Sequence, residues 1–272
     1  MTSSPYDVIY QNPNYANHEK VTIYCVHGTA DRSSAFTLIA ERLLDKLPNV
    51  VASIHLVSFK NRGKGKGIEV FAKQLQEKIR ANKDQDIILM GHSRGGLVVS
   101  YFAEYFAAEI HANVHGVVAI CSPFGGSDLA IAPLSWLSDS VKQMESESEF
   151  LNNLRKDITH SNINYYFVAA EKDSLVSMDQ SFVKKDSASL TIFDRHGHLS
   201  IMSSWRLVEH IQRCVHRMLI TPSKKELDEM KSTEIENQWT VVNVAPTENE
   251  IKELELEEEG SWMVASNPSR DS

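Results

Sequence analysis

The sequence predicts an α/β fold with a mostly parallel sheet of about six strands and helices on both faces. Short apolar runs rich in β-branched residues alternate along the chain with stretches whose apolar residues recur every three or four positions. This alternation is typical of strand–helix units with parallel strands. The chain has 272 residues, of which 42% are hydrophobic, enough for one large domain with its own core. The expected strands are 21–26, 50–59, 87–90, a run ending near 120, 164–170 and 190–193.

The segment Gly91-His92-Ser93-Arg94-Gly95 joins the apolar run 87–90 to a helix-like stretch. A serine on such a sharp turn exposes its hydroxyl, and the residues two positions before and after it leave no room for a Cβ atom. Both are glycine here. The helix that follows brings backbone N–H groups and its positive end beside the serine. This order predicts Ser93 as a nucleophile; the alternative is an ordinary turn with an inert serine.

An early strand also ends in a loop that suits this chemistry. The run 21–26 leads into His27-Gly28-Thr29 and then into a helical stretch over about 35–47. Acyl transfer from a serine needs two backbone N–H groups aimed at the oxyanion, one from the residue after the nucleophile and one from an early strand-to-helix loop. We expect these from Arg94 and Thr29. The alternative is a plain glycine turn.

An acid and a histidine each follow a later strand. The run 164–170 ends in a segment containing Glu171 and Asp173, and the run 190–193 ends in one containing His196 and His198. The order serine, acid, histidine suits a Ser-His-Asp triad, in which histidine takes the serine proton and aspartate orients the imidazole. We prefer Asp173, because apolar residues anchor its loop, and His198, because Gly197 permits close approach. Glu171 and His196 are the rivals.

Taken together, these segments resemble α/β-hydrolases of the lipase/esterase type, especially bacterial triacylglycerol lipases and the glycosylphosphatidylinositol-deacylase-like group. The matching segments lie at 26–29, 91–96, 120–130, 173–176 and 197–198, within about residues 18–219. The resemblance implies an α/β-hydrolase fold and ester cleavage through an acyl-enzyme, with no cofactor. It departs at Arg94, where many lipases have a smaller or apolar residue, and at Phe124, where many have histidine.

Several residues are expected to border the substrate. His27, His92 and Phe124 flank the matching segments. The loop 60–66 follows a strand, and its Lys60, Arg62 and Lys64 would attract an anionic head group, because the carboxyl ends of strands border the site in such folds. The alternative is a flexible exposed loop whose cations keep it soluble.

Residues 128–160 form a short helical insert in this scheme. Apolar residues recur there at helical spacing, and Ser148 is placed to cap a second helix. The insert is expected to cap the pocket; the alternative is ordinary crossover structure packed on the sheet.

The composition of the chain indicates where the protein is located and which groups it is expected to lack. No apolar run approaches the 18 residues of a membrane span, and the N-terminal segment lacks the pattern of a secretory signal, so we expect a cytoplasmic protein with at most transient membrane-surface contact. Cys25, Cys121 and Cys214 are expected to be reduced thiols, two of them in buried strands. Apart from His196-x-His198, the histidines show no metal-ligand spacing, so no metal is expected.

The charge divides the chain into a catalytic body, 1–221, and an acidic tail, 222–272. The tail holds 13 acidic and 5 basic residues, a net charge of −8 that equals that of the whole chain. Such a tail is expected to be disordered or loosely helical, and this charge distribution excludes a nucleic-acid site. Trp239 with Val242, and Trp262, lie in apolar islands typical of peptides that dock on a partner. The first island resembles a W-x-x-V motif that binds ubiquitin-like autophagy adaptors; the alternative is packing on the body.

The sequence therefore predicts a carboxylic-ester hydrolase acting on a small-molecule or lipid ester, including phospholipid. A thioesterase or amidase would use the same triad, so these remain alternatives. A non-catalytic binding protein that acts through its tail is the alternative from a different class.

Overall fold

The short apolar runs form one central sheet. A computed structural model describes residues 7–16, 19–28, 36–59, 66–127 and 139–219, and the backbone of 240–244. The described strands stand in the order β1-β3-β2-β4-β5-β6-β7-β8, and every neighbouring pair is parallel except β1 with β3. Their bounds are β1 Val8–Gln11, β2 Val21–Val26, β3 Val51–Val57, β4 Asp86–His92, β5 Asn113–Ile120, β6 Tyr165–Ala170, β7 Ala188–Phe193 and β8 Thr240–Val244.

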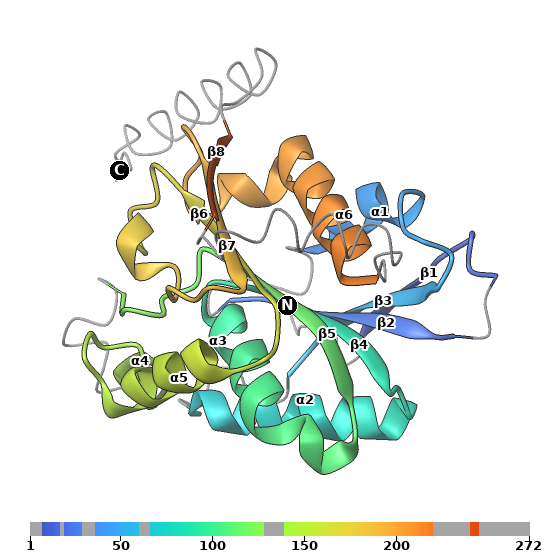
Figure 1. Cartoon of the computed structure of the whole chain (residues 1–272), viewed down its shortest axis with the longest axis horizontal. Coiled ribbons are helices and arrows are strands. Elements are labelled where there is room, and N and C mark those ends of the chain that lie inside the picture. Colours follow the sequence, from blue (N-terminus) through green and yellow to red (C-terminus); the bar gives the residue numbers. More distant parts are fainter. Residues whose placement is uncertain are drawn as a thin grey trace, which may run out of the picture.

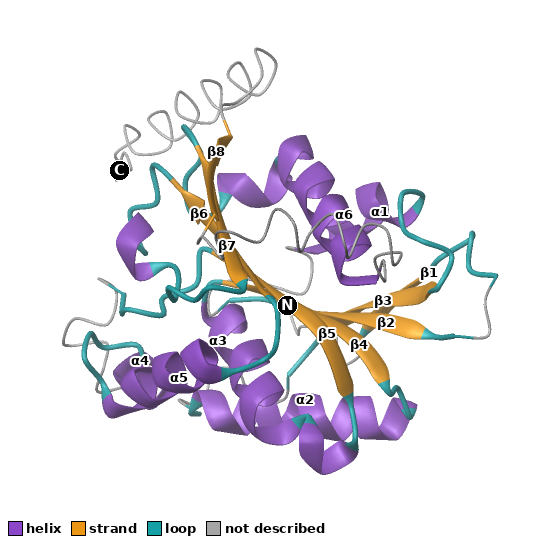
Figure 2. Cartoon of the chain, viewed as in Figure 1, coloured by secondary structure: helices purple, strands orange, loops and turns teal. Residues whose placement is uncertain are grey.

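Helices cover both faces of this sheet, as the sequence predicts. Figures 1 and 2 show α1 and α6 on one side and the other four helices on the other. Side chains alternate between the faces along each strand, so Ile23 and Cys25 join the core under α1 and α6, whereas Tyr24 and Val26 join the opposite core. The helices are α1 Thr37–Leu44, α2 Ile68–Asn82, α3 Arg94–Tyr101, α4 Asp139–Gln143, α5 Glu149–His160 and α6 Trp205–Leu219.

The buried sides of the helices follow the sequence pattern. In α5, Leu151, Leu154 and Ile158 are buried at helical spacing, and the Ser148 hydroxyl accepts the Leu151 N–H at 3.2 Å, which confirms the expected cap.

None of the helices in the described part of the chain has the length and apolar character needed to cross a bilayer.

The strand order creates a switch point between β2 and β4. The chain leaves β2 for β3 on one side and returns to β4 on the other, and α1 and α3 pack on opposite faces. A crevice forms beyond the carboxyl ends of strands at such a point, which is where open α/β sheets bind ligands. The segments after Val26 and His92 both begin there.

The sheet has two strands more than expected. β1 adds an antiparallel edge beside β3, and β8 adds a parallel edge beside β7 with Thr240 opposite Ser189. β8 comes from the segment assigned to the acidic tail, so residues 240–244 belong to the central sheet rather than to a separate tail. A five-residue strand bounded by polar segments gives little periodicity, and only pairing with β7 reveals it.

The expected insert is helical where it is described. The apolar side of α5 joins the core under the sheet, so α5 is a crossover helix between β5 and β6. This matches the second of the two alternatives for that segment. Residues 128–138 lie outside the described residues.

Candidate active site

Ser93 occupies a strained turn between β4 and α3. Its backbone has φ 55° and ψ −130°, a conformation that a residue with a side chain rarely adopts. A Cβ atom on Gly91 would lie 2.4 Å from Gly96 N, and one on Gly95 would lie 2.0 Å from Val26 O. Glycine is therefore required at both positions. Gly91 is constrained by Gly95 and Gly96 across the turn, whereas Gly95 is constrained by the end of β2.

The loop after β2 lies against this serine. A Cβ atom on Gly28 would lie 2.9 Å from Ser93 Cβ and 3.3 Å from Ser93 Oγ, so only glycine permits the approach. Thr29, the expected second oxyanion donor, lies outside the described residues. Arg94 is the first residue of α3, where backbone N–H groups point away from the helix toward the serine end.

His198 and Asp173 form a buried pair. His198 Nδ1 lies 2.7 Å from Asp173 Oδ2, and the two side chains are 8% and 1% exposed. Asp173 Oδ1 accepts N–H groups of Leu175 and Val176, both at 2.9 Å. Burial alone would raise the pKa of the Asp173 carboxyl, but the hydrogen bond and charge of His198 and the two N–H groups outweigh it and hold this pKa below its ordinary value. An ionised carboxylate only accepts, so Nδ1 carries the proton and Nε2 is the basic nitrogen.

The two rivals serve other purposes. The Glu171 carboxylate accepts the backbone N–H of Arg195 at 2.9 Å and so joins the acid loop to the histidine loop. His196 is 1% exposed, places Nδ1 2.8 Å from Asp194 O and packs edge-on against Phe193. Both residues brace the loops that carry Asp173 and His198.

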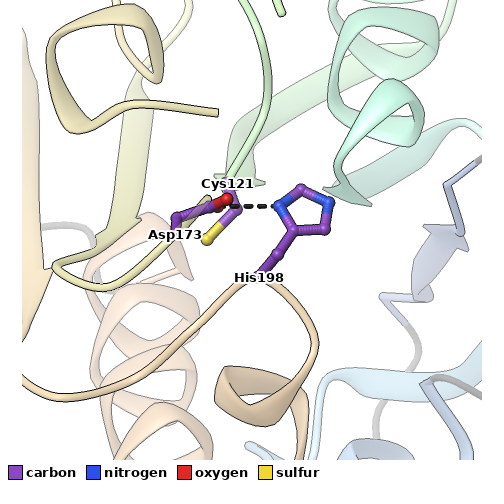
Figure 3. Close-up of side chains that lie close together, drawn as sticks. All are labelled: Cys121, Asp173 and His198. Atoms are coloured by element: carbon purple, nitrogen blue, oxygen red, sulfur yellow. Dashed lines mark hydrogen bonds and ion pairs between the residues drawn. The ribbon is translucent and has the colours of Figure 1, made fainter. Parts of the chain in front are cut away.

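Cys121 joins this pair, although the sequence identified it only as a core thiol. Figure 3 shows its sulfur beside the Asp173 carboxylate, which accepts the dashed hydrogen bond from His198. Cys121 follows β5 with φ 47°, and this left-handed backbone turns its side chain toward the acid loop. The sequence pattern could not predict this contact, because the contact depends on how close the ends of β5 and β6 lie in the folded sheet.

The donor atoms of Cys121, Asp173 and His198 lie within 4.8 Å of one another, the one cluster in the described part of the chain with such metal-ligand spacing. Burial, and then the Asp173 charge, raises the pKa of the Cys121 thiol well above its ordinary value. Within this cluster Nδ1 of His198 is already hydrogen-bonded to Asp173, and the buried thiol would have to lose its proton before it could bind a metal. Cys25, which was expected in a buried strand, is buried in β2, and Cys214 is buried as well.

Three residues expected at the substrate are buried instead. His92 is 0% exposed, and its Nε2 lies 2.8 Å from His198 O. Phe124 is 0% exposed and packs edge-on against Phe167 in the core. His27 is 2% exposed, with Nδ1 2.9 Å from Gly28 O. Residue order could not show this, because a neighbour of the nucleophile can face either the pocket or the sheet.

The Arg94 side chain also turns inward. It is 3% exposed, its guanidinium lies 4.6 Å from the Phe71 ring centre, and Nη1 donates to Ser140 Oγ at 3.2 Å. It therefore links α3 to α2 and α4. Lys60, Arg62 and Lys64, and the tail residues Trp239 and Trp262, lie outside the described residues. Val242 lies in β8, where only the backbone is described.

Comparison with known proteins agrees with the observed fold. No curated protein matches the chain in sequence. Among solved structures, a mature lipase from Bacillus licheniformis has a TM-score of 0.58 at 16% identity, covering 78% of this chain and 99% of the lipase. A monoacylglycerol lipase from Paleococcus ferrophilus has a TM-score of 0.57 at 16% identity, covering 78% and 97%. A phospholipase from Legionella pneumophila has a TM-score of 0.60 at 10% identity, covering 78% of this chain and 61% of the phospholipase.

At such identities these likenesses establish the fold alone. The sequence profile described as the Alpha/beta hydrolase family matches residues 23–160, just over half of the chain. That range includes most of β2, the Ser93 turn and α5. The chain belongs to the alpha/beta hydrolase family.

Proposed function

We propose that this protein is a serine hydrolase that cleaves carboxylic esters, with Ser93 as nucleophile, His198 as general base and Asp173 as the group that orients the base. One observation carries the proposal: the buried His198–Asp173 hydrogen bond of 2.7 Å, in a loop bonded to the residue before Ser93. A turn with a purely structural role does not require a strained serine, a basic imidazole nitrogen and an ionised carboxylate together.

The reaction begins with attack of Ser93 Oγ on the acyl carbon. His198 Nε2 takes the hydroxyl proton, and Asp173 stabilises the imidazolium that forms. The oxyanion accepts the backbone N–H groups of Arg94 and Thr29. The imidazolium then protonates the departing alcohol and leaves an acyl-enzyme. Water, deprotonated by His198, attacks this ester, and the acid product departs as Ser93 recovers its proton.

The substrate class follows from family likeness and from the sequence. The lipases and the phospholipase named above support an apolar acyl group on an alcohol or lipid head group. The cationic loop 60–66 would favour an anionic head group, including that of a phospholipid. The reaction itself requires no cofactor, and a cytoplasmic location remains part of this proposal.

Hydrolysis of p-nitrophenyl esters of increasing acyl length tests the proposal, with thioester and amide substrates in parallel. We expect turnover that Ser93→Ala abolishes and that Ser53→Ala, a change in a buried serine of β3, retains. A fluorophosphonate probe should label the wild type at Ser93. If no substrate is turned over and Ser93 is not labelled, a binding protein acting through the segment with Trp239, Val242 and Trp262 becomes the better hypothesis.

A preference for thioesters or amides would replace the ester assignment and leave the triad unchanged, because the acyl half-reaction is shared. The cationic loop is tested separately, by neutralising Lys60, Arg62 and Lys64. A rise in KM confined to anionic esters would support its role, whereas an equal rise for neutral esters would exclude it.

A further inference from the structure

His92 makes a contact with the candidate base that the proposed mechanism does not use. Its side chain is 0% exposed, and Nε2 lies 2.8 Å from the backbone oxygen of His198, a residue 106 positions later. The two imidazole rings lie 4.8 Å apart between centres at a tilt of 45°. The residue immediately before the nucleophile therefore touches the residue proposed to activate it.

The direction of this hydrogen bond is fixed by chemistry. A carbonyl oxygen only accepts, so Nε2 of His92 carries the proton and donates. The bond is buried, and a buried carbonyl that loses its donor leaves an acceptor without a partner. It joins the end of β4 to the loop between β7 and α6. In the sheet, β5 and β6 separate β4 from β7.

His198 is thereby held at two points. Asp173 fixes the ring through Nδ1, and His92 fixes the main chain through the carbonyl oxygen. Within the loop, Gly197 N–H donates to Ser200 Oγ at 2.9 Å, and Lys172 N–H donates to His196 O at 2.9 Å. The first bond stabilises the conformation of the loop, and the second bond joins the loop to the segment that carries Asp173. The His92 hydrogen bond ties this loop to β4, the strand that leads into Ser93.

We infer that His92 is a positioning residue, which sets the distance between the His198 imidazole and the Ser93 hydroxyl through the His198 carbonyl. This inference rests on the proposed function, because it deepens the assignment of Ser93 and His198. His92 is not a substrate ligand, since it is fully buried. It exchanges no proton in the reaction, because its Nε2 proton is committed to a carbonyl.

The physical reason for such a residue lies in the topology. Ser93 and His198 come from strands separated by β5 and β6 in the sheet, so small shifts across intervening strands would add up between them. A misplacement of about 1 Å can lower a rate about a hundredfold. The direct hydrogen bond between His92 and His198 limits these shifts, because it joins the loop of the base to the residue before the nucleophile.

The test compares His92→Phe, which keeps a ring of similar size without a donor, with His92→Gln, which keeps an N–H donor. We expect His92→Phe to lower kcat by about tenfold to hundredfold with little change in KM, because the loss falls on the transition state. His92→Gln should restore much of kcat. The matched control is His55→Phe, in a histidine of β3 that is 6% exposed and bonded to Ser53.

A second readout is independent of turnover. The Nδ1 proton of His198 is observable by NMR in the 15N-labelled full chain and is assigned by its loss in His198→Gln. In His92→Phe we expect this proton to exchange with water faster than in the wild type and in His55→Phe. Thermal unfolding of every variant establishes the folded fraction used to normalise kcat.

A folded His92→Phe with wild-type kcat and an unchanged Nδ1 proton would overturn the inference. So would equal losses in His92→Phe and His55→Phe, because the role would then be stability alone. If the wild type turns over no substrate and Ser93 is not labelled, the proposed function fails. In that case an unchanged Nδ1 proton in His92→Phe would overturn the positioning role too, whereas faster exchange would support it.

Discussion

Two buried clusters of polar side chains lie on the same sheet, and both contain a histidine and an aspartate. At the carboxyl edge, His198 is bonded to Asp173 in the loops after β7 and β6. Toward the amino edge, Asp84 accepts Tyr24 Oη–H at 2.5 Å and Lys20 Nζ at 2.6 Å. Asn82 Nδ2 donates to the Tyr24 hydroxyl at 2.9 Å.

The histidine of the second cluster is engaged on both sides. His55 Nε2 lies 3.0 Å from Ser53 Oγ, and Nδ1 lies 3.4 Å from Asn82 Nδ2. These groups belong to regular strands and a helix end, with no strained residue among them. A buried histidine and aspartate are therefore insufficient to indicate catalysis. The carboxyl-edge cluster differs because its histidine loop is bonded to His92, the residue before the strained Ser93.

The sharpest way to break this comparison is to remove one carboxylate from each cluster. Asp173→Asn should lower kcat about 10⁴-fold while the protein stays folded, because an amide that donates to Nδ1 selects the wrong tautomer. Asp84→Asn should instead cost about 1–3 kcal/mol of unfolding free energy, because buried donors lose their acceptor, with kcat per folded molecule unchanged. Steady-state kinetics and urea unfolding measure both. Loss of activity in a folded Asp84→Asn would show that the clusters are coupled.

The clusters should also respond to acid in different pH ranges. Burial lowers the pKa of His55, although the charges of Asp84 and Asp7 oppose it, so His55 stabilises the fold above its unfolded pKa of about 6.5. That stability is lost as the pH falls from there through the folded pKa. The pKa of Asp173 is also lowered, so its contribution is present above about 3.9 and is lost only below that.

Urea unfolding at a series of pH values checks this difference. His55→Phe should flatten the pH dependence of stability below about pH 6.5, whereas Asp173→Asn should flatten it only below about 3.9. Part of the slope should survive in His55→Phe, because burial also lowers the pKa of His210 to about 4. Identical slopes in His55→Phe and the wild type would contradict the assignment to His55.

A smaller effect is expected from the thiol beside Asp173. Cys121→Ala removes a weak donor and should lower kcat by less than about tenfold, or about 1.4 kcal/mol, whereas Cys121→Ser should stay close to the wild type. The control is Cys25→Ala, a buried thiol of β2 that is not part of the Cys121–Asp173–His198 cluster, which should reduce stability alone. Equal kcat losses in Cys121→Ala and Cys25→Ala would remove any special role for Cys121.

The smallest effect on activity is expected at the far edge of the sheet. Truncation after residue 221 removes β8 and exposes the backbone edge of β7, so we expect a lower Tm and self-association with little change in kcat. Truncation after Ala245 keeps β8 and should behave as the full chain. Light scattering and thermal unfolding distinguish the two. If both truncations lose equal stability, the effect comes from beyond β8.

Much of the fold was predictable from local pattern. The buried run Val21–Val26 has the bounds that the sequence indicated, because a short, continuous apolar run rich in strand-forming residues favours a buried strand. β1 and β8 were missed, because short edge strands depend on a partner. The sequence also left open whether α5 caps the pocket or crosses under the sheet, since an apolar helix face does not specify the surface it covers.

At the candidate site, the sequence by itself determined which residue types follow the strands: a serine between two glycines on a strand-to-helix turn, then in order an acid and a histidine. Glycine spacing and strand order are local properties, so they can be read along the chain. Only the tertiary structure decided that Asp173 rather than Glu171 meets His198, that Cys121 lies beneath them, and that His92 and Phe124 face the interior. These choices depend on where separate loops meet after the strands are aligned, and such contacts leave no pattern in the order of residues.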